Sequence, residues 1–123
     1  GAGAIGSTYA WKLAAAGHEV AIVDVWREHV EAVSRHGLVV ELPDGTTEAV
    51  QVRATVDPSE LNPVDLVIVA TKAYATVDAA RSAMRCSGPG TWVGTVQNGL
   101  GNEWRAVATA LLARHTEALR LGR

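Results

Sequence analysis

Three glycines at the start of the chain constrain its fold more than any other feature. Gly1, Gly3 and Gly6 fit the spacing G-x-G-x-x-G, and good helix formers follow up to residue 16. Residues 19–25, EVAIVDV, are apolar and β-branched, which predicts a buried strand. A turn, a helix and a strand in this order indicate a parallel α/β sheet with a strand before the turn. We expect that strand upstream of Gly1 and interpret the chain, which has no initiator methionine, as a fragment.

The glycine turn predicts a dinucleotide site. In such turns the second glycine lets the backbone approach a pyrophosphate, and the third lets the helix pack closely on the strand. The phosphates lie at the helix N-terminus, where free N–H groups and the helix dipole favour anions. The alternative is a glycine-rich turn that only packs. The predicted binding residues of the turn are Gly1, Ala2, Gly3, Ala4, Ile5 and Gly6.

Asp24 lies at the end of the predicted strand, about 20 residues after the turn, where an acidic side chain would accept hydrogen bonds from the ribose hydroxyls. This placement slightly favours NAD(H) over NADP(H), because the 2′-phosphate of NADP would face a like charge. Arg27 follows closely and could instead pair with that phosphate, so both nucleotides stay open. A solvated strand end is the alternative interpretation of Asp24.

The rest of the chain continues the alternation of helices and strands. A helix is predicted over residues 27–36, and two alternating runs around Pro-Asp-Gly-Thr at 43–46 predict a β-hairpin. We expect a loop or a single helical turn at DPSELNP and a buried strand at VDLVIVAT. We expect a helix over residues 75–85, which SGPG at 87–90 breaks. TWVGTV is a further strand, and residues 104–119 are helical. The predicted fold is α/β, a doubly wound, mostly parallel, Rossmann-like sheet with an inserted β-hairpin and its first strand missing.

Two polar residues follow predicted strands at the edge where open α/β sheets bind ligands. Lys72 comes just after VDLVIVAT, and Asn98 just after TWVGTV. A lysine suits cofactor phosphates or a carboxylate substrate, and an amide could orient a carboxamide or a hydroxyl. The alternatives are a solvated loop lysine and an Asn-Gly turn.

These motifs together resemble the N-terminal domain of ketopantoate reductases. The resemblance rests on GAGAIG, AAAGHEV, TKAY and QNGLGNE in that order, and it runs from Gly1 to about Glu103. It implies an NAD(P)H-dependent oxidoreductase that reduces the keto acid 2-dehydropantoate in pantothenate and coenzyme A biosynthesis. The glycines match the phosphate turn of the family. Lys72 matches a lysine near the cofactor and the active-site cleft, and Asn98 an asparagine near the nicotinamide and the substrate.

The chain also departs from the family. Residues 1–103 correspond to an incomplete dinucleotide-binding domain and residues 104–123 to a helical tail, without the helical domain that supplies the family's general-acid lysine. We therefore expect the chain alone to be inactive, and copies of it to associate through uncovered sheet edges. A standalone dinucleotide-sensing module and a non-functional remnant are the alternatives.

Composition narrows the function classes further. The net charge of −2 and scattered arginines argue against nucleic-acid and membrane-surface partners, and the sequence contains no long apolar run. The single cysteine, Cys86, favours a reducing, cytoplasmic setting. The four histidines show no metal-binding spacing, so no metal site is predicted.

Overall fold

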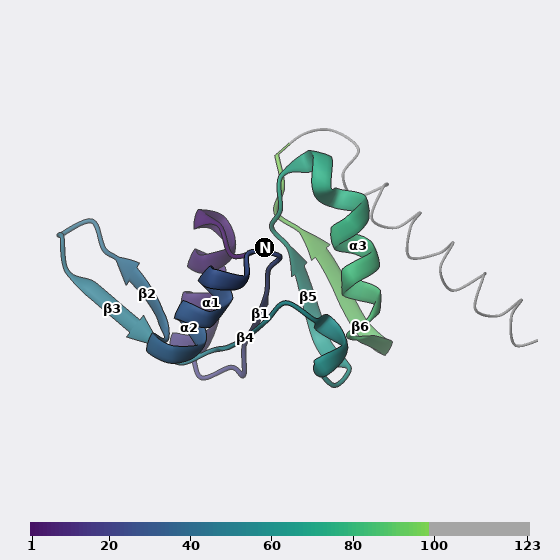
Figure 1. The fold of residues 1–123 in the computed structure, drawn as a ribbon, viewed down its shortest axis with the longest axis horizontal. Coiled ribbons are helices and arrows are strands. Elements are labelled where there is room, and N and C mark those ends of the chain that lie inside the picture. Colours follow the sequence, from purple (N-terminus) through teal and green to yellow (C-terminus); the bar gives the residue numbers. More distant parts are fainter. Residues whose placement is uncertain (99–123) are drawn as a thin grey trace, which may run out of the picture. The chain divides into compact units, whose positions relative to one another are not determined.

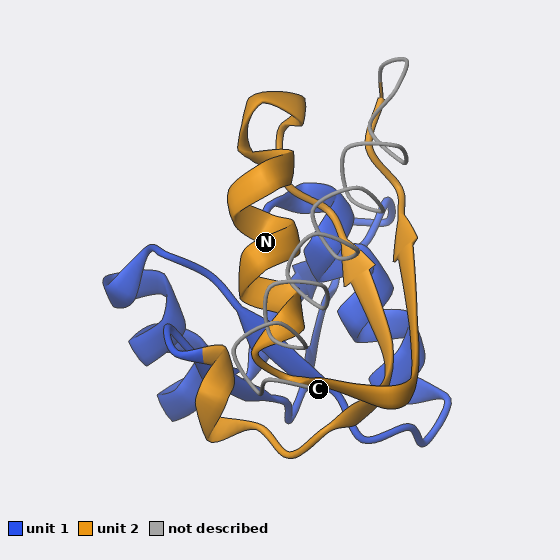
Figure 2. Cartoon of the chain, turned by 90° about the vertical axis from the view of Figure 1, so that its right-hand side faces the viewer, with its two compact units in different colours: residues 1–57 blue, residues 58–123 orange. Residues whose placement is uncertain are grey.

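The computed structural model describes residues 1–98 of the chain. It divides into two compact units, one of residues 1–57 and one that begins at Pro58, drawn in blue and orange in Figure 2. The helix predicted over residues 104–119 and most of QNGLGNE lie outside the described residues. Within residues 1–98, no helix is long and apolar enough to cross a membrane.

The first unit alternates helices with short strands. Its two helices end within one residue of the predicted positions 16 and 36, because Gly17 and Gly37, just past their ends, adopt φ values of 90° and 78°. Glycine suits these left-handed conformations because it lacks a Cβ. The elements in chain order are α1 (Ala4–Ala15), β1 (Ala21–Val23), α2 (Arg27–His36), β2 (Leu38–Glu41), β3 (Thr47–Val50) and β4 (Arg53–Thr55) (Figure 1).

The predicted β-hairpin is confirmed. β2 and β3 pair antiparallel, with Leu38 opposite Val50. In the connecting turn the Leu42 N–H donates to the Thr46 carbonyl at 2.8 Å, and Gly45 takes a φ of 82°. The Asp44 carboxylate accepts the Thr46 N–H at 2.9 Å, which is the side-chain-to-backbone bond that makes aspartate common in turns.

β1 and β4 form a parallel pair, with Ala21 opposite Arg53 and Val23 opposite Thr55. The strand predicted over residues 19–25 is therefore shorter than expected, since only residues 21–23 lie in the ladder. The sequence does not predict β4, because Arg-Ala-Thr has no apolar run of its own. Pairing with β1 makes it a strand, an instance of tertiary context overriding local propensity.

The core of the first unit forms where α1, α2 and the strands meet. Leu38 is 2% exposed and Ile22 6%, and burial of such side chains contributes about 1.5–3 kcal/mol each. The turn itself reaches this core, because Ala2 is only 7% exposed. The buried cluster consists of Ala2, Ala10, Ile22, Val33 and Leu38.

The second unit is a parallel strand pair with a helix packed against it (Figure 1). Val69, at the end of the first strand, lies opposite Thr95 on the second. The predicted α/β class, with parallel strands and an inserted hairpin, is thus confirmed. The described elements of this unit are η1 (Pro58–Glu60), β5 (Val64–Val69), η2 (Ala73–Ala75), α3 (Thr76–Met84) and β6 (Ser87–Thr95), where η marks a 3₁₀ turn.

The segment SGPG differs from the prediction. α3 already ends at Met84, and residues 87–90 belong to β6 as an irregular start of the strand rather than a break before it. The register passes from Val64 opposite Ser87 to Leu66 opposite Trp92, so β6 carries extra residues here. The Thr91 hydroxyl secures this bulge by accepting the Gly88 N–H and donating to the Val64 carbonyl.

Candidate functional site

The glycine turn leads into α1 without a side-chain cap. Gly3 is the N-cap residue of α1, with φ −69° and ψ −176°, and its carbonyl accepts the Ser7 N–H at 2.8 Å. The Ser7 hydroxyl donates back to the Ala2 carbonyl at 2.9 Å. The first turn of α1 contains no acidic residue. The helix therefore presents unpaired N–H groups and the positive end of its dipole at the turn.

Nothing within the described chain requires a glycine at position 3. Its φ is one that any residue adopts, and a Cβ built on Gly3 would meet no atom within 4 Å. Open space of this kind lets a ligand approach the backbone closely, which a side chain would prevent. The turn therefore has the features that a bound pyrophosphate requires.

Asp24 lies directly against this turn. Its Oδ2 accepts the Ala2 N–H at 2.6 Å, and its Oδ1 accepts the Trp26 N–H at 2.9 Å. The residue follows β1, and its own N–H donates to the Thr55 carbonyl of β4 at 3.3 Å. The carboxylate is therefore held in place between the glycine turn and the start of α2. The predicted proximity of Asp24 to the turn is seen, whereas its role stays a prediction.

Several effects act on the pKa of the Asp24 carboxyl. Burial raises this pKa. The hydrogen bonds from the Ala2 and Trp26 N–H groups, together with the nearby Gly1 amino group and His29, lower it by more than burial raises it. The net pKa lies below the usual value for aspartate. Asp24 is therefore a fixed negative charge at neutral pH.

Asp24 is expected to make the folded chain less stable in acid. A carboxyl with a lower pKa in the folded state stabilises the fold above its unfolded-state pKa of about 3.9, and that contribution is lost as pH falls through the folded-state value. Between about pH 5 and about pH 2, the wild type should lose more unfolding free energy than Asp24→Asn, by at most about 1 kcal/mol because solvent screens this partly exposed carboxyl. Urea denaturation of the complete gene product that contains residues 1–123 measures the difference.

The control for this experiment is Asp78→Asn on α3, where Asp78 meets Arg81 at 3.6 Å on the surface. This variant should follow the wild type, because exposed ion pairs contribute little to stability. An identical loss in the wild type and in Asp24→Asn would contradict the role assigned to Asp24.

Arg27 and Trp26 flank Asp24 at the start of α2. Arg27 is exposed, and no residue in the described part of the chain forms an ion pair or hydrogen bond with its side chain. Trp26 is 62% exposed and stacks on His29, with ring centroids 5.5 Å apart and planes 23° apart. Arg27 is thus accessible and not bonded to Asp24, and its pairing with a 2′-phosphate stays a prediction.

Lys72 and Asn98 both lie beyond the carboxyl ends of the parallel strands β5 and β6. Lys72 precedes η2 and is exposed, and its carbonyl accepts the Ala75 N–H at 2.9 Å. Asn98 is the last described residue and is also exposed. The second unit therefore places the two residues at one edge of its strand pair, where ligands of parallel sheets bind. The six turn residues, Asp24 and Arg27 belong to the first unit.

Gln97 is a residue that the sequence analysis does not single out. Its side-chain Nε2 donates to the Thr71 carbonyl at 2.9 Å, and its Oε1 accepts the Thr95 hydroxyl at 2.9 Å. The amide thus joins the segment after β5 to the end of β6. The sequence feature that could have pointed to Gln97 is the alternation of strand residues, which places positions 95 and 97 on one face of the strand.

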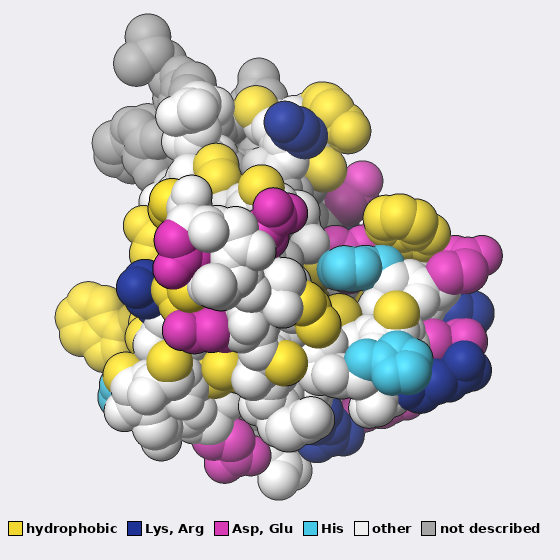
Figure 3. Space-filling view, turned by 90° about the vertical axis from the view of Figure 1, so that its left-hand side faces the viewer, with side chains coloured by type: hydrophobic (Ala, Val, Ile, Leu, Met, Phe, Trp, Pro, Cys, Tyr) yellow, Lys and Arg dark blue, Asp and Glu magenta, His cyan; other side chains and the backbone are white. Residues whose placement is uncertain are grey.

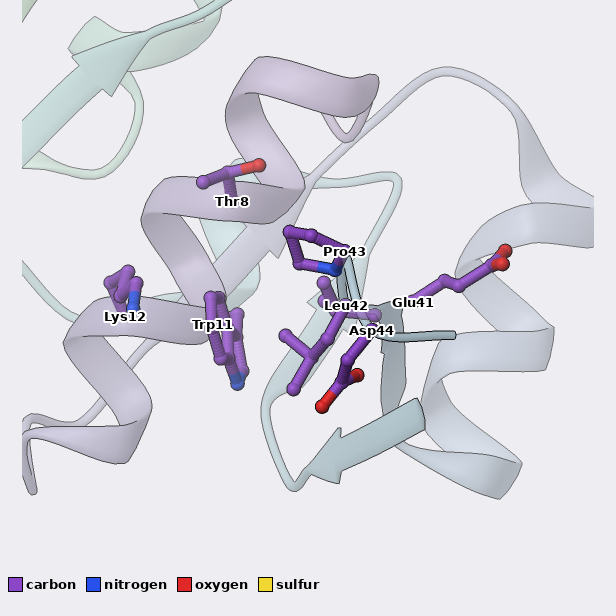
Figure 4. A pocket seen from close by; sticks show the side chains of 8 residues that line it. Thr8, Trp11, Lys12, Glu41, Leu42, Pro43 and Asp44 are labelled. Carbon is purple, nitrogen blue, oxygen red and sulfur yellow. The ribbon is translucent and has the colours of Figure 1, made fainter. Parts of the chain in front are cut away.

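A separate hollow lies between α1 and the hairpin turn (Figure 4). It has a volume of about 600 Å³, and Trp11, Leu42 and Pro43 contribute to its walls. The Trp11 Nε1–H donates to Glu48 at 2.9 Å, and the Lys12 ammonium lies 4.0 Å from the Trp11 ring centroid. Lys12 is thus engaged on the surface of the first unit, and none of the predicted site residues line this hollow.

Elsewhere in the described residues 1–98, we find no second cluster of charged side chains that suggests a site. On the face drawn in Figure 3, acidic and basic side chains are interspersed with hydrophobic ones. Residues 1–98 contain no cluster of three or more potential metal ligands. Burial raises the pKa of the Cys86 thiol, which is the opposite of an activated cysteine.

The family model "Ketopantoate reductase PanE/ApbA" matches residues 1–118. The chain belongs to the ketopantoate reductase family. It is 40% identical to the 2-dehydropantoate 2-reductase of Halobacterium salinarum over 119 residues and 44% identical to that of Pyrococcus abyssi over 105 residues. These matches cover 96% and 84% of this chain but 37% and 33% of the relatives, so the chain spans about a third of their length.

Solved structures of a ketopantoate reductase and of a D-mandelate dehydrogenase also resemble the chain. A PanE/ApbA family ketopantoate reductase from Ralstonia eutropha is 34% identical, with a TM-score of 0.79 over 87% of this chain and 35% of that one. A D-mandelate dehydrogenase solved with NADH and anilino(oxo)acetate is 30% identical, with a TM-score of 0.80 over 89% of this chain and 35% of that one. The resemblance that the motifs predict is thus confirmed at the level of the family.

Proposed function

We propose that the chain supplies the nucleotide-binding part of an NAD(P)H-dependent oxidoreductase that reduces 2-dehydropantoate to pantoate in pantothenate and coenzyme A biosynthesis. Family membership and the names of the relatives support this reaction. The observation that carries the nucleotide site is the open space at Gly3, beside an uncapped helix N-terminus and a fixed carboxylate. A cytoplasmic location stays a prediction.

In this proposal the predicted residues other than Arg27 bind different parts of the cofactor and the substrate. The bound NAD(P)H would supply the hydride that reaches the ketone carbon. The N-terminus of α1 holds the pyrophosphate, and Asp24 accepts hydrogen bonds from the adenosine ribose. Lys72 provides a positive charge for the cofactor or the substrate carboxylate, and Asn98 orients the nicotinamide or the substrate by hydrogen bonding. We expect the lysine that protonates the ketone oxygen to lie outside residues 1–123, in a helical substrate domain.

NADH is the nucleotide that we propose for this site. The Asp24 carboxylate is held by two backbone N–H groups, so its negative charge stays where a 2′-phosphate would lie. Each carboxylate oxygen retains a lone pair for a ribose hydroxyl. The similarity to a D-mandelate dehydrogenase whose structure contains NADH is in line with this choice. Arg27, exposed at the start of α2, is the feature that favours NADPH.

A second candidate substrate is an aryl keto acid. The D-mandelate dehydrogenase fits the described fold as well as the ketopantoate reductase structure does, with TM-scores of 0.80 and 0.79. A shared fold does not fix the substrate, so the two keto acids have to be compared directly.

The test uses the complete gene product with NADH or NADPH, and with 2-dehydropantoate or phenylglyoxylate as the keto acid. Loss of the nicotinamide absorbance is expected with 2-dehydropantoate. If phenylglyoxylate is turned over faster, the proposed substrate becomes an aryl keto acid. Tight NADH binding without turnover of either acid would favour the dinucleotide-sensing module, and no binding of either nucleotide would overturn the proposal.

Replacing Lys72 by Met should lower kcat/KM for the keto acid by about tenfold, because a charge-assisted contact to an anion is lost. Steady-state kinetics of the complete gene product measure the effect. Lys12 is the other lysine of the sequence, and Lys12→Met is the matched control because Lys12 rests on the Trp11 ring. Equal kcat/KM losses in both variants would show that Lys72 has no specific role.

A further inference from the structure

The Gln97 side chain occupies the point where β5 and β6 stop pairing. The last ladder bond between the strands runs from the Val96 N–H to the Val69 carbonyl, at 3.1 Å. Beyond it the chain turns into η2 after β5, and toward Asn98 after β6. Within residues 1–98 the strand pairing ends at this bond, and side-chain hydrogen bonds connect the two segments beyond it.

The amide of Gln97 makes this connection with both of its ends. Its Nε2 lies 2.9 Å from the Thr71 carbonyl and 3.3 Å from the Lys72 carbonyl. Because carbonyl oxygens only accept hydrogen bonds, this end must be the NH₂ group. Its Oε1 lies 2.9 Å from the Thr95 hydroxyl and 3.2 Å from the Thr76 hydroxyl.

The contacts of the Gln97 side chain are partly shielded from water, apart from the exposed one to the Lys72 carbonyl. Thr76, the first residue of α3, is 1% exposed, and its hydroxyl donates to the Ala73 carbonyl at 2.7 Å. Partly shielded hydrogen bonds hold their geometry better than fully exposed ones. The Gln97 amide therefore fixes the backbone at Thr71 and Lys72, whereas the single hydrogen of the Thr76 hydroxyl is used by the shorter bond to the Ala73 carbonyl.

We propose that Gln97 is a positioning residue, which sets the location of Lys72 relative to Asn98 through the backbone of the segment after β5. The inference rests on the proposed function, in which Lys72 and Asn98 contact the cofactor or the substrate. Gln97 itself need not touch either molecule. Displacing a contact group by about 1 Å can lower a rate by up to about 100-fold, so a fixed backbone at this point matters for turnover.

The test is a double-mutant cycle in the complete gene product. Gln97→Glu keeps the shape of the side chain but turns a carboxylate oxygen toward the Thr71 and Lys72 carbonyls, and Gln97→Met removes all of its hydrogen bonds. In the wild-type background each should lower kcat by roughly tenfold. In a Lys72→Met background the same substitutions should change kcat by less than about twofold, since the group they position is absent. Gln51→Glu, an exposed site in the first unit, is the matched control and should leave kcat unchanged.

The outcomes separate this inference from the proposed function. A general loss of stability would lower the melting temperature and reduce kcat equally in both backgrounds, and such additive effects would overturn the positioning role. Wild-type kcat in both Gln97 variants would overturn it as well. An unchanged kcat/KM in Lys72→Met alone would instead remove the role of Lys72 in the proposed function, and the inference with it.

Discussion

Gly3→Val is expected to weaken NADH binding by at least about 100-fold while leaving the fold intact. The valine would occupy the open space beside the N-cap of α1, where the pyrophosphate has to approach the backbone. The folded chain should accept it without strain, because the φ of Gly3 is −69° and no atom lies within 4 Å of the new Cβ. Fluorescence titration of the complete gene product with NADH measures the binding, and thermal melting measures the stability.

The matched control is Gly90→Val at the start of β6. A Cβ at Gly90 also meets no atom within 4 Å, and its φ is not in the left-handed region. It lies at the amino end of the strand, away from the edge that carries Asn98. Gly90→Val should therefore bind NADH as the wild type does. Unchanged NADH binding by Gly3→Val would mean that the turn is only a packing element.

The residues of a short sequence window were sufficient to predict the helices that end at a glycine and the hairpin whose turn contains one. α1 and α2 stop at Gly17 and Gly37, and the hairpin turns at Gly45, where only the backbone conformation of a single residue decides the outcome. The spacing from the glycine turn to Asp24 was sufficient as well, since helix and strand lengths fix that distance.

Other features depend on partners far away in the sequence. β4 is a strand because β1 lies beside it, and the irregular start of β6 forms because the Thr91 hydroxyl reaches the Val64 carbonyl. The role of Gln97 depends on residues about 20 or more positions away, such as Thr71 and Thr76. No periodicity within a short window encodes such contacts, which is why they appear only in the folded chain.

The anchoring of Asp24 lies between these two cases. The spacing predicts where Asp24 lies, but not that both carboxylate oxygens accept backbone N–H groups. These two hydrogen bonds bear on whether the site can bind NADPH. A free carboxylate could turn outward to make room for a phosphate paired with Arg27, whereas turning this one would break two hydrogen bonds to a charged group, each worth about 1.5–3 kcal/mol.

Asp24→Ala should therefore lower the preference for NADH over NADPH by roughly 100-fold. Two losses add in this ratio: the hydrogen bond from the 2′-hydroxyl, which only NADH has, to a charged group, worth about 1.5–3 kcal/mol, and repulsion of the 2′-phosphate of NADPH, worth about 1 kcal/mol. Any general loosening of the turn, from the loss of the Ala2 contact, affects both nucleotides and cancels in the ratio. The measurement is kcat/KM with each nucleotide in the complete gene product.

Arg27→Ala is the matched variant, because Arg27 is the nearby group that could bind the 2′-phosphate. If Asp24 determines the preference, Arg27→Ala should leave the NADH to NADPH ratio within about threefold of the wild type, since neither ribose hydroxyl of NADH needs a cation. A wild-type enzyme that prefers NADPH and loses this preference in Arg27→Ala would contradict the proposal. Arg27 would then bind the phosphate, and the Asp24 carboxylate would serve only to hold the glycine turn against the start of α2.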